Sequence, residues 1–460
     1  MSISPRTLSL STAMAATLAL SSCATPGSSA PDAGAHTNSP SSTAENTGGT
    51  ADRQEVDAPA PRAVLTYDGG LMTVDTETGE VVGDIETEGF LRLNNAGDGR
   101  HVLISDGDEF RVFDSGLIAE GHGDHDHYYE TLPALTGASI EAPEAAHVVA
   151  YEGKTALFAD GTGGITVMDS TAFSDGKVTQ DEIEEHATDA AHHGVAVPLS
   201  SGDLLLTQGT AESRNTVEVV SPEGDVVAET TDCPGVHGEA TAQATNHGDV
   251  VTLGCENGPV IYRDGAFHKV PVEEQYQRSG NLFGNHGSPI VLADYKTDPD
   301  ADQERPTRIG LIDTRAASMT TVDLGSPYWF RSLARGADGE ALVLTYDGEL
   351  NILDEETGKI LHEVPVTAPW EEPEEWQSAA PAVKVGTDGF AYVTEPATKK
   401  LHVIDIAAGT LLDSFDLPET PVELAVLTGE AEAPDHEHEN DHGQDHADGE
   451  DHAKSEEEGH

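Results

Sequence analysis

The chain contains an internal repeat, and this repeat limits the possible folds more than any other feature of the sequence. Residues 64–82 read VLTYDGGLMTVDTETGEVV, and residues 343–361 read VLTYDGELNILDEETGKIL. Each copy has an apolar strand, an Asp-Gly turn, an alternating strand that ends in Asp, and a Thr-Gly turn into another strand. Asp-Gly and Thr-Gly pairs supply the positive φ angles that tight hairpins need. The repeat therefore predicts a tandem array of antiparallel hairpins.

Weaker copies of the same pattern run through the rest of the body, in the segments 101–113, 148–168, 204–219, 250–262, 290–312 and 392–404. A spacing of roughly 40 to 50 residues is typical of propeller blades with four strands each. We therefore predict an all-β fold, a β-propeller of about seven or eight four-stranded blades, closed by a last strand near 422–427. Residues 179–191 depart from the pattern. They are acidic and helix-like, which predicts an insertion between blades.

The charge balance disfavours whole classes of partner. Lys and Arg number 23 and Asp and Glu number 84, so the formal net charge is −61. A nucleic-acid-binding protein needs a basic face for the phosphate backbone, which excludes that class. The same charge argues against binding to anionic lipid headgroups. The natural partners are cations, either metal ions or basic protein surfaces.

The N-terminus has the features of an export signal. Arg6 precedes an apolar stretch over residues 8–20, which is too short to span a bilayer as a helix. The stretch ends in Leu-Ser-Ser-Cys23, which resembles the bacterial lipobox, where the cysteine is acylated and becomes the first mature residue. Ordinary signal-peptidase cleavage beside an incidental cysteine is the alternative. We expect an exported, extracytoplasmic protein that is lipid-anchored to the cell membrane through Cys23.

Composition then divides the chain into four parts. Residues 1–22 form the lipoprotein signal peptide. Residues 23–61 are rich in Ser, Thr, Pro, Gly and Ala without apolar periodicity, which is typical of a disordered tether. Residues 62–429 hold the predicted propeller. Residues 430–460 are rich in His, Asp and Glu and predict a disordered tail.

Removing Cys23 from the count leaves an even pair of cysteines. Cys233 and Cys255 flank one predicted hairpin. In an oxidising compartment such a pair favours a disulfide. The alternative is a pair of thiolate zinc ligands.

The chain has 21 histidines, and two groups of them stand among acidic residues. The first group lies in an internal loop and consists of His122, His125 and His127. The second lies in the tail and consists of His436, His438, His442, His446, His452 and His460. Imidazoles with carboxylates suit borderline divalent metals, Zn²⁺ foremost. Both groups therefore predict loose zinc sites, with chance clustering and a merely solvated acidic tail as the alternatives.

A third set of histidines precedes short apolar strands. His193, His237 and His286 each stand in a His-Gly pair, and His147 is a possible fourth member. If these strands are the innermost ones of consecutive blades, the side chains converge at one mouth of the central channel. Three histidines with a carboxylate such as Glu239 make a plausible tetrahedral zinc site. Turn histidines that bond to the backbone are the alternative.

These motifs together resemble a known family. The His-Asp-His loop before Tyr128, the segments 192–198 and 232–240, and the segment 254–258 are similar to those of the AztD-type zinc metallochaperones. The resemblance covers the body from about residue 62 to 429. It implies an extracytoplasmic zinc carrier that delivers zinc to the solute-binding protein of a zinc ABC importer. It also implies a channel-mouth zinc site from the His-Gly motifs, with a His-rich segment as an auxiliary site.

We therefore expect a zinc-binding chaperone, a monomer and not an enzyme. No Ser-His-Asp or paired-carboxylate spacing stands out, although the acidic residues are too numerous for their spacing to be informative. The alternatives are a structural or adhesive surface propeller and a metal-dependent propeller enzyme. The lipobox and the His-rich tail are departures from the family, and they concern how this chain would reach its partner.

Overall fold

Both copies of the internal repeat fold as antiparallel strands joined by the same turn. In the first copy the Asp75 carboxylate accepts a hydrogen bond from the backbone N–H of Thr78 at 2.9 Å. In the second copy the Asp354 carboxylate accepts the equivalent bond from Thr357 at 2.8 Å. Gly79 follows with a φ of +74°, which an L side chain rarely adopts. The sequence Asp-x-x-Thr-Gly thus encodes the turn between the third and the outer strand of a sheet.

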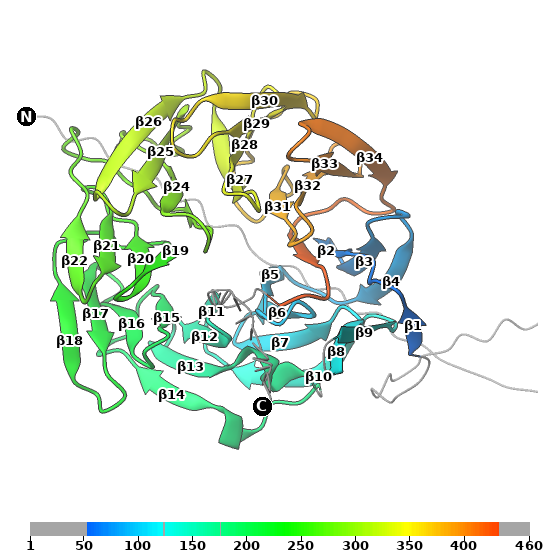
Figure 1. Ribbon diagram of the computed structural model, residues 1–460, viewed down its shortest axis with the longest axis horizontal. Helices are drawn as coiled ribbons and strands as arrows, with labels where there is room; N and C mark the ends of the chain where they lie inside the picture. Colours follow the sequence, from blue (N-terminus) through cyan, green and yellow to red (C-terminus); the bar gives the residue numbers. More distant parts are fainter. Residues whose placement is uncertain (1–52, 123–124, 175, 432–460) are drawn as a thin grey trace, which may run out of the picture. The chain divides into compact units, whose positions relative to one another are not determined.

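The computed structural model describes residues 53–122, 125–174 and 176–431. All of them lie in one compact unit, which spans residues 46–460. This part of the chain contains eight four-stranded antiparallel sheets, which follow one another around a ring (Figure 1). The predicted all-β propeller is confirmed. Within the described residues, no helix is long and apolar enough to span a membrane.

The first four sheets in chain order comprise, from inner to outer strand, β35 (Leu424–Leu427), β2 (Arg62–Tyr67), β3 (Gly70–Asp75), β4 (Val81–Glu86); β5 (Arg92–Asn95), β6 (His101–Asp106), β7 (Glu109–Asp114), β10 (Ala134–Glu141); β11 (Ala145–Tyr151), β12 (Lys154–Ala159), β13 (Gly164–Asp169), β14 (Glu184–Ala187); and β15 (Ala196–Pro198), β16 (Leu204–Gly209), β17 (Arg214–Val220), β18 (Val226–Thr230).

The other four comprise, in the same order, β19 (Glu239–Thr245), β20 (Gly248–Leu253), β21 (Val260–Arg263), β22 (Ala266–Lys269); β23 (Leu282–Phe283), β24 (Ile290–Asp294), β25 (Arg308–Asp313), β26 (Ser318–Asp323); β27 (Tyr328–Arg335), β28 (Ala341–Thr345), β29 (Glu349–Leu353), β30 (Ile360–Pro365); and β31 (Val383–Val385), β32 (Phe390–Glu395), β33 (Lys400–Asp405), β34 (Thr410–Asp416). Two short 3₁₀ helices, η1 (Ser170–Phe173) and η2 (Gln180–Glu182), lie between β13 and β14.

The hydrophobic core is divided among the interfaces between neighbouring sheets. One cluster, for example, joins Leu342 and Leu350 of one sheet to Val393 and Ile404 of the next. The ring is closed by β35, which pairs antiparallel with β2 in the register Leu427 opposite Arg62. This closing strand was expected from the sequence. The first sheet is thus built from both ends of the described chain, which closes the ring.

The segment 179–191 was expected to be a helix-like insertion between blades, but its only helix is the short η2 and it belongs to the third sheet. Its centre is β14, the outer strand of the third sheet, which pairs with β13 in the register His186 opposite Ile165. An outer strand has one free edge and exposed faces, and Glu184, Glu185 and Ala187 are exposed. The acidic pattern therefore reflects a solvated edge strand, a common way to prevent edge-to-edge pairing.

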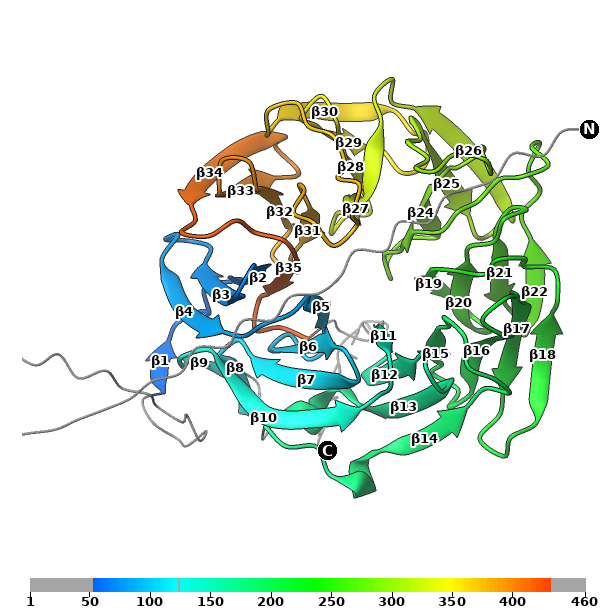
Figure 2. The same ribbon diagram turned by 180° about the vertical axis from the view of Figure 1, so that it is seen from behind.

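A small three-stranded sheet lies beside the ring. It consists of β1 (Gln54–Val56), β9 (His125–Glu130) and β8 (Leu117–His122), in the order β1-β9-β8. Figures 1 and 2 show it at the rim, near β4 and β10. Residues 54–56 belong to the segment that the sequence assigned to a disordered tether. They are a strand here because β9 offers them a free edge for pairing.

Candidate metal centre

Three imidazoles meet where the inner strands of three consecutive sheets begin. His147 lies near the start of β11, and His193 and His237 lie just before β15 and β19. Their ligand atoms all lie within 4.8 Å of one another. The Nε2 atoms of His147 and His193 are 3.3 Å apart. Two nitrogens bound tetrahedrally to one zinc ion at about 2.0–2.1 Å would be about 3.3 Å apart, so this spacing fits zinc.

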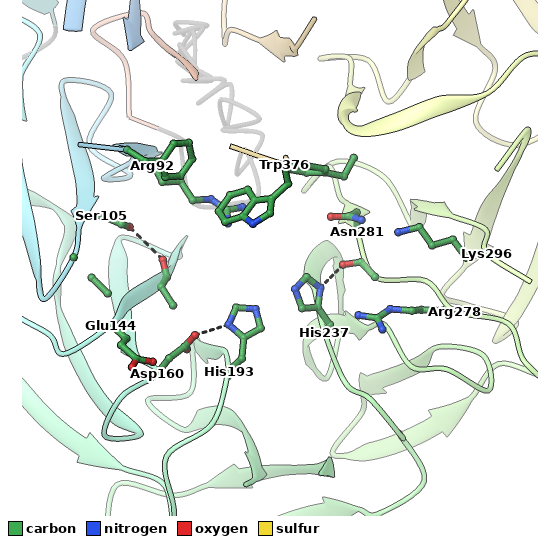
Figure 3. Close-up of a pocket in the computed structure, with 16 residues that line it drawn as sticks. Arg92, Ser105, Glu144, Asp160, His193, His237, Arg278, Asn281, Lys296 and Trp376 are labelled. Carbon is green, nitrogen blue, oxygen red and sulfur yellow. Dashed lines mark hydrogen bonds and ion pairs between the residues drawn. The ribbon is translucent and has the colours of Figure 1, made fainter. Parts of the chain in front are cut away.

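Hydrogen bonds from Nδ1 orient two of the rings. The His193 Nδ1 atom lies 2.5 Å from the Asp160 carboxylate, and the His237 Nδ1 atom lies 2.6 Å from the Gly280 carbonyl oxygen (Figure 3). If each Nδ1 donates its proton to these acceptors, each Nε2 keeps its lone pair for a metal. The carboxylate of Glu239 lies behind the third ring, with Oε2 3.8 Å from Nδ1 of His147.

Burial changes the protonation of this group. It lowers the pKa of His237 to about 3, with a further contribution from His193. It also lowers the pKa of His147 well below the usual value, helped by the neighbouring His237 and His193. Both rings are therefore neutral at neutral pH, which is the form that binds metals. Burial has the opposite effect on Glu239 and raises its pKa to about 8.

A cavity of about 790 Å³ opens onto His193 and His237. We call it the histidine cavity. Its lining also includes Arg92 and Asn281, each at or next to the start of an inner strand, so the cavity marks the end of the ring at which the inner strands begin. We call this end the cavity mouth. The side chain of His147 is more deeply buried than that of His193, with 16% against 34% exposed.

His286 does not join the other histidines. It follows the inner strand β23 instead of preceding it, so it lies at the end of the ring away from the cavity mouth. Its Nε2 is 3.1 Å from the hydroxyl of Thr241, and its ring contacts Tyr151 at the far end of β11. The His-Gly pair is the same as at His193 and His237, but the strand that follows it is the second strand of its sheet.

The second histidine cluster lies on the hairpin of β8 and β9. His122, His125 and His127 have their ligand atoms within 4.8 Å of one another, and His122 pairs with His125 across the hairpin. His127 Nδ1 is 3.1 Å from the carboxylate of Glu55 on β1. The hairpin leaves the propeller after Asp114, the end of β7 away from the cavity mouth. The point where the β8–β9 hairpin leaves the propeller is thus separated from the histidine cavity by the length of a strand.

A disulfide fixes the backbone beside His237. Cys233 and Cys255 are bonded, and they join the segment before β19 to the segment just after β20. The His237 N–H donates to the Gly254 carbonyl at 3.0 Å in the same region. Cys23 and the tail histidines His436, His438, His442 and His446 lie outside the described residues.

The chain is similar over most of its length to proteins of known name and structure. No protein-family model matches the chain. The zinc chaperone AztD of Citrobacter koseri is 25% identical over 380 residues, which cover 80% of this chain and 86% of AztD. The chain resembles a zinc chaperone. Two structures of C. koseri AztD, one of them apo, each superpose with a TM-score of 0.68, at 23% and 22% identity.

These AztD structures cover 80% and 81% of this chain, and 98% and 99% of their own. Dihydro-heme d1 dehydrogenase NirN is a more distant structural neighbour, with a TM-score of 0.51 and 14% identity over 82% of this chain and 77% of its own. The structural likeness shows the shared propeller fold. The resemblance to AztD drawn from the sequence motifs is confirmed.

Of the residues that the sequence grouped at the channel mouth, the structure brings His193 and His237 together and places Glu239 beside His147. The sequence analysis included His286 in the predicted site and named His147 only as a fourth candidate. It did not identify Asp160. The signal for His147 was its position at the start of a predicted strand. Asp160 gave no signal, because one aspartate among 84 acidic residues does not stand out.

Proposed function

We propose that this protein is an extracytoplasmic zinc chaperone that captures zinc and transfers it to the solute-binding protein of a zinc ABC importer, without catalysing a reaction of its own. The observation that carries the proposal is the group His147, His193 and His237, whose ligand atoms lie within 4.8 Å. The resemblance to a zinc chaperone supports zinc as the cargo.

The geometry suits a carrier. Neutral imidazoles need not lose protons before they bind zinc, so capture at neutral pH is direct. Three protein ligands leave a fourth position on a tetrahedral ion, and the histidine cavity gives access to it. A ligand from a partner protein can enter there and displace the histidines one at a time. The hairpin histidines, and the tail outside the described residues, serve as auxiliary collecting sites in this proposal.

Glu239 allows a test of whether zinc binding releases a proton. With a pKa of about 8 it is mostly protonated at pH 7, and a zinc ion nearby favours the carboxylate. Zinc binding should therefore release the Glu239 proton, and zinc affinity should rise as the pH rises from 6 to 8. The number of protons released on zinc binding is measured by calorimetry at pH 7 in two buffers of different ionisation enthalpy. The Glu239→Gln variant should release about one proton fewer than the wild type. Equal release by both proteins would contradict this role.

Transfer itself is tested by mixing. The zinc-loaded protein is combined with the purified apo solute-binding protein of a zinc importer from the same organism. We expect the acceptor to take up zinc faster than zinc dissociates spontaneously from the loaded protein, as measured by a chelator chase. Equal rates of transfer and of spontaneous release would contradict a chaperone.

Truncation after Gly429 should lower the zinc stoichiometry but leave the tightest site present.

The membrane anchor is a separate part of the proposal, supported by the Leu-Ser-Ser-Cys23 sequence. We expect Cys23→Ala to move the protein from the membrane fraction to the soluble fraction without a change in zinc binding. Fractionation followed by mass measurement of the mature N-terminus checks this. A wild-type protein without an acyl chain would reject the anchor.

A further inference from the structure

The histidine cavity has an unusual charge for this chain. Acidic residues outnumber Lys and Arg by 84 to 23 in the sequence. The cavity lining nevertheless includes three cations, Arg92, Arg278 and Lys296, against two acidic residues. In Figure 3, Arg92 reaches toward the cavity from one side, and Arg278 and Lys296 reach toward it from the other. The local charge is therefore inverted relative to the whole protein.

These cations differ in how they are compensated. Arg278 lies 3.6 Å from the Glu256 carboxylate, and Lys296 lies 3.2 Å from that of Asp294. Arg92, half-buried at the start of β5, has no ion pair or side-chain hydrogen bond within residues 53–122, 125–174 and 176–431. A half-buried guanidinium without a partner is unfavourable, since it gives up hydration without gaining a hydrogen bond.

The protein groups nearest to Arg92 do not supply the missing charge. Glu239 is close enough for Arg92 to act on it electrostatically, but its ion-pair partner among the described residues is His147, at 3.8 Å. Arg331 and Lys384 also lie close enough to interact with Arg92, and both carry the same sign. The carboxylate in this neighbourhood, that of Glu423, forms an ion pair with Arg331 and not with Arg92.

Zinc binding increases this imbalance. A zinc ion held by His147 and His237 adds positive charge next to Arg92 and Arg278, since Arg92 already acts electrostatically on the His147 ring and Arg278 on the His237 ring. An anion that enters with the zinc ion removes the repulsion, and a carboxylate can bond to a guanidinium and to zinc together.

The cavity has room for such a ligand. Its volume of about 790 Å³ is far larger than one metal ion needs. Phe90, Phe330 and Trp376 form an apolar part of the lining, and Phe90 and Trp376 contact each other edge to face with centroids 5.1 Å apart. Aromatic walls with a few convergent polar groups are typical of sites for small organic ligands.

We propose that Arg92, with Arg278 and Lys296, forms a carboxylate-binding subsite, so that the cavity takes zinc together with a small carboxylate ligand. The carboxylate bonds to Arg92 and occupies the fourth position on the ion. This proposal rests on the proposed zinc site, because the carboxylate is held between the guanidinium and the metal. No bond is made or broken in the ligand.

The test uses the apo full-length protein at pH 7, with free zinc set by a chelator buffer. Zinc affinity is measured in chloride alone and with malonate, a dicarboxylate that binds zinc weakly on its own. We expect malonate to tighten zinc binding about tenfold, the change that roughly one hydrogen bond to a charged group supplies. Arg92→Gln should show no response to malonate. Arg315→Gln, an exposed arginine in the turn after β25, should respond like the wild type.

If Arg92→Gln does not fold, Arg92→Lys is used instead, because it keeps the positive charge. A weaker effect of malonate on zinc affinity in Arg92→Lys than in the wild type supports the subsite, because an ammonium lacks the paired donors of a guanidinium. The chain truncated after Gly429 identifies the source of the carboxylate. A malonate response in both chains supports a free small carboxylate. A response confined to the truncated chain supports the subsite but assigns its occupant to the acidic tail.

Two results overturn the subsite. One is an unchanged zinc affinity in malonate for both the full and the truncated chains, and the other is a malonate response that survives in Arg92→Gln. Neither result affects the proposed function, which fails separately if His193→Ala leaves zinc affinity unchanged.

Discussion

Replacing His237 with Ala is expected to weaken zinc binding at the cavity mouth by more than about a hundredfold. Removing a group that hydrogen-bonds to a metal ligand typically lowers metal affinity about 10–100-fold. His237 is proposed to be a ligand itself, so its removal should cost more. Its ring centroid lies 5.0 Å from that of His193 and 5.6 Å from that of His147, so its removal takes one of the three ligands from the group. Competition titration against a chromogenic chelator measures the change.

His286→Ala is the matched control for this experiment. It removes the same side chain from the same His-Gly context and at similar burial, but at the far end of the ring. We expect it to bind zinc like the wild type. The weak sites should survive in both variants. If His286→Ala weakens zinc binding as much as His237→Ala, or if truncation after Gly429 removes all tight binding, the three-histidine site is wrong.

The fold was predictable because its signals are local. Asp75 and Thr78 form the same turn as Asp354 and Thr357, and a turn of this kind depends only on residues next to one another in the sequence. The closing strand β35 was also found, since an unpaired apolar segment at the end of a ring has one natural partner. The outer strand β14 was missed because its exposed acidic residues lack the apolar alternation that marks a half-buried strand.

The site was only partly predictable because it depends on strand direction. A His-Gly pair before an apolar strand looks the same whether that strand is the first or the second of its sheet. At His193 it is the first, and at His286 it is the second, which moves the side chain to the opposite end of the ring. The short strand β23, with only two residues, left no apolar pattern to show the difference. Arg92 was missed for a similar reason, since only the folded ring shows that it lacks a partner.

Removing the disulfide should affect both stability and zinc binding. The double variant Cys233→Ala/Cys255→Ala should lose about 2–4 kcal/mol in the free energy of unfolding, because the bond closes a loop in the unfolded chain. The bond has a sequence separation of 22, and both cysteines are almost fully buried, at 0% and 1% exposed. Denaturant unfolding of the variant and of the oxidised and reduced wild type measures the loss.

The effect on zinc follows from where the bond lies. Cys233 precedes His237 by four residues, and Cys255 follows Gly254, which bonds to the backbone of both His237 and Gly238. Without the disulfide, His237 is held less rigidly, so ordering the site costs more conformational entropy and zinc affinity should fall. Reduced wild type should bind zinc as weakly as the double variant. If reduction instead exposes two thiols that zinc protects from alkylation, and if zinc affinity rises, Cys233 and Cys255 are zinc ligands and not a structural bond.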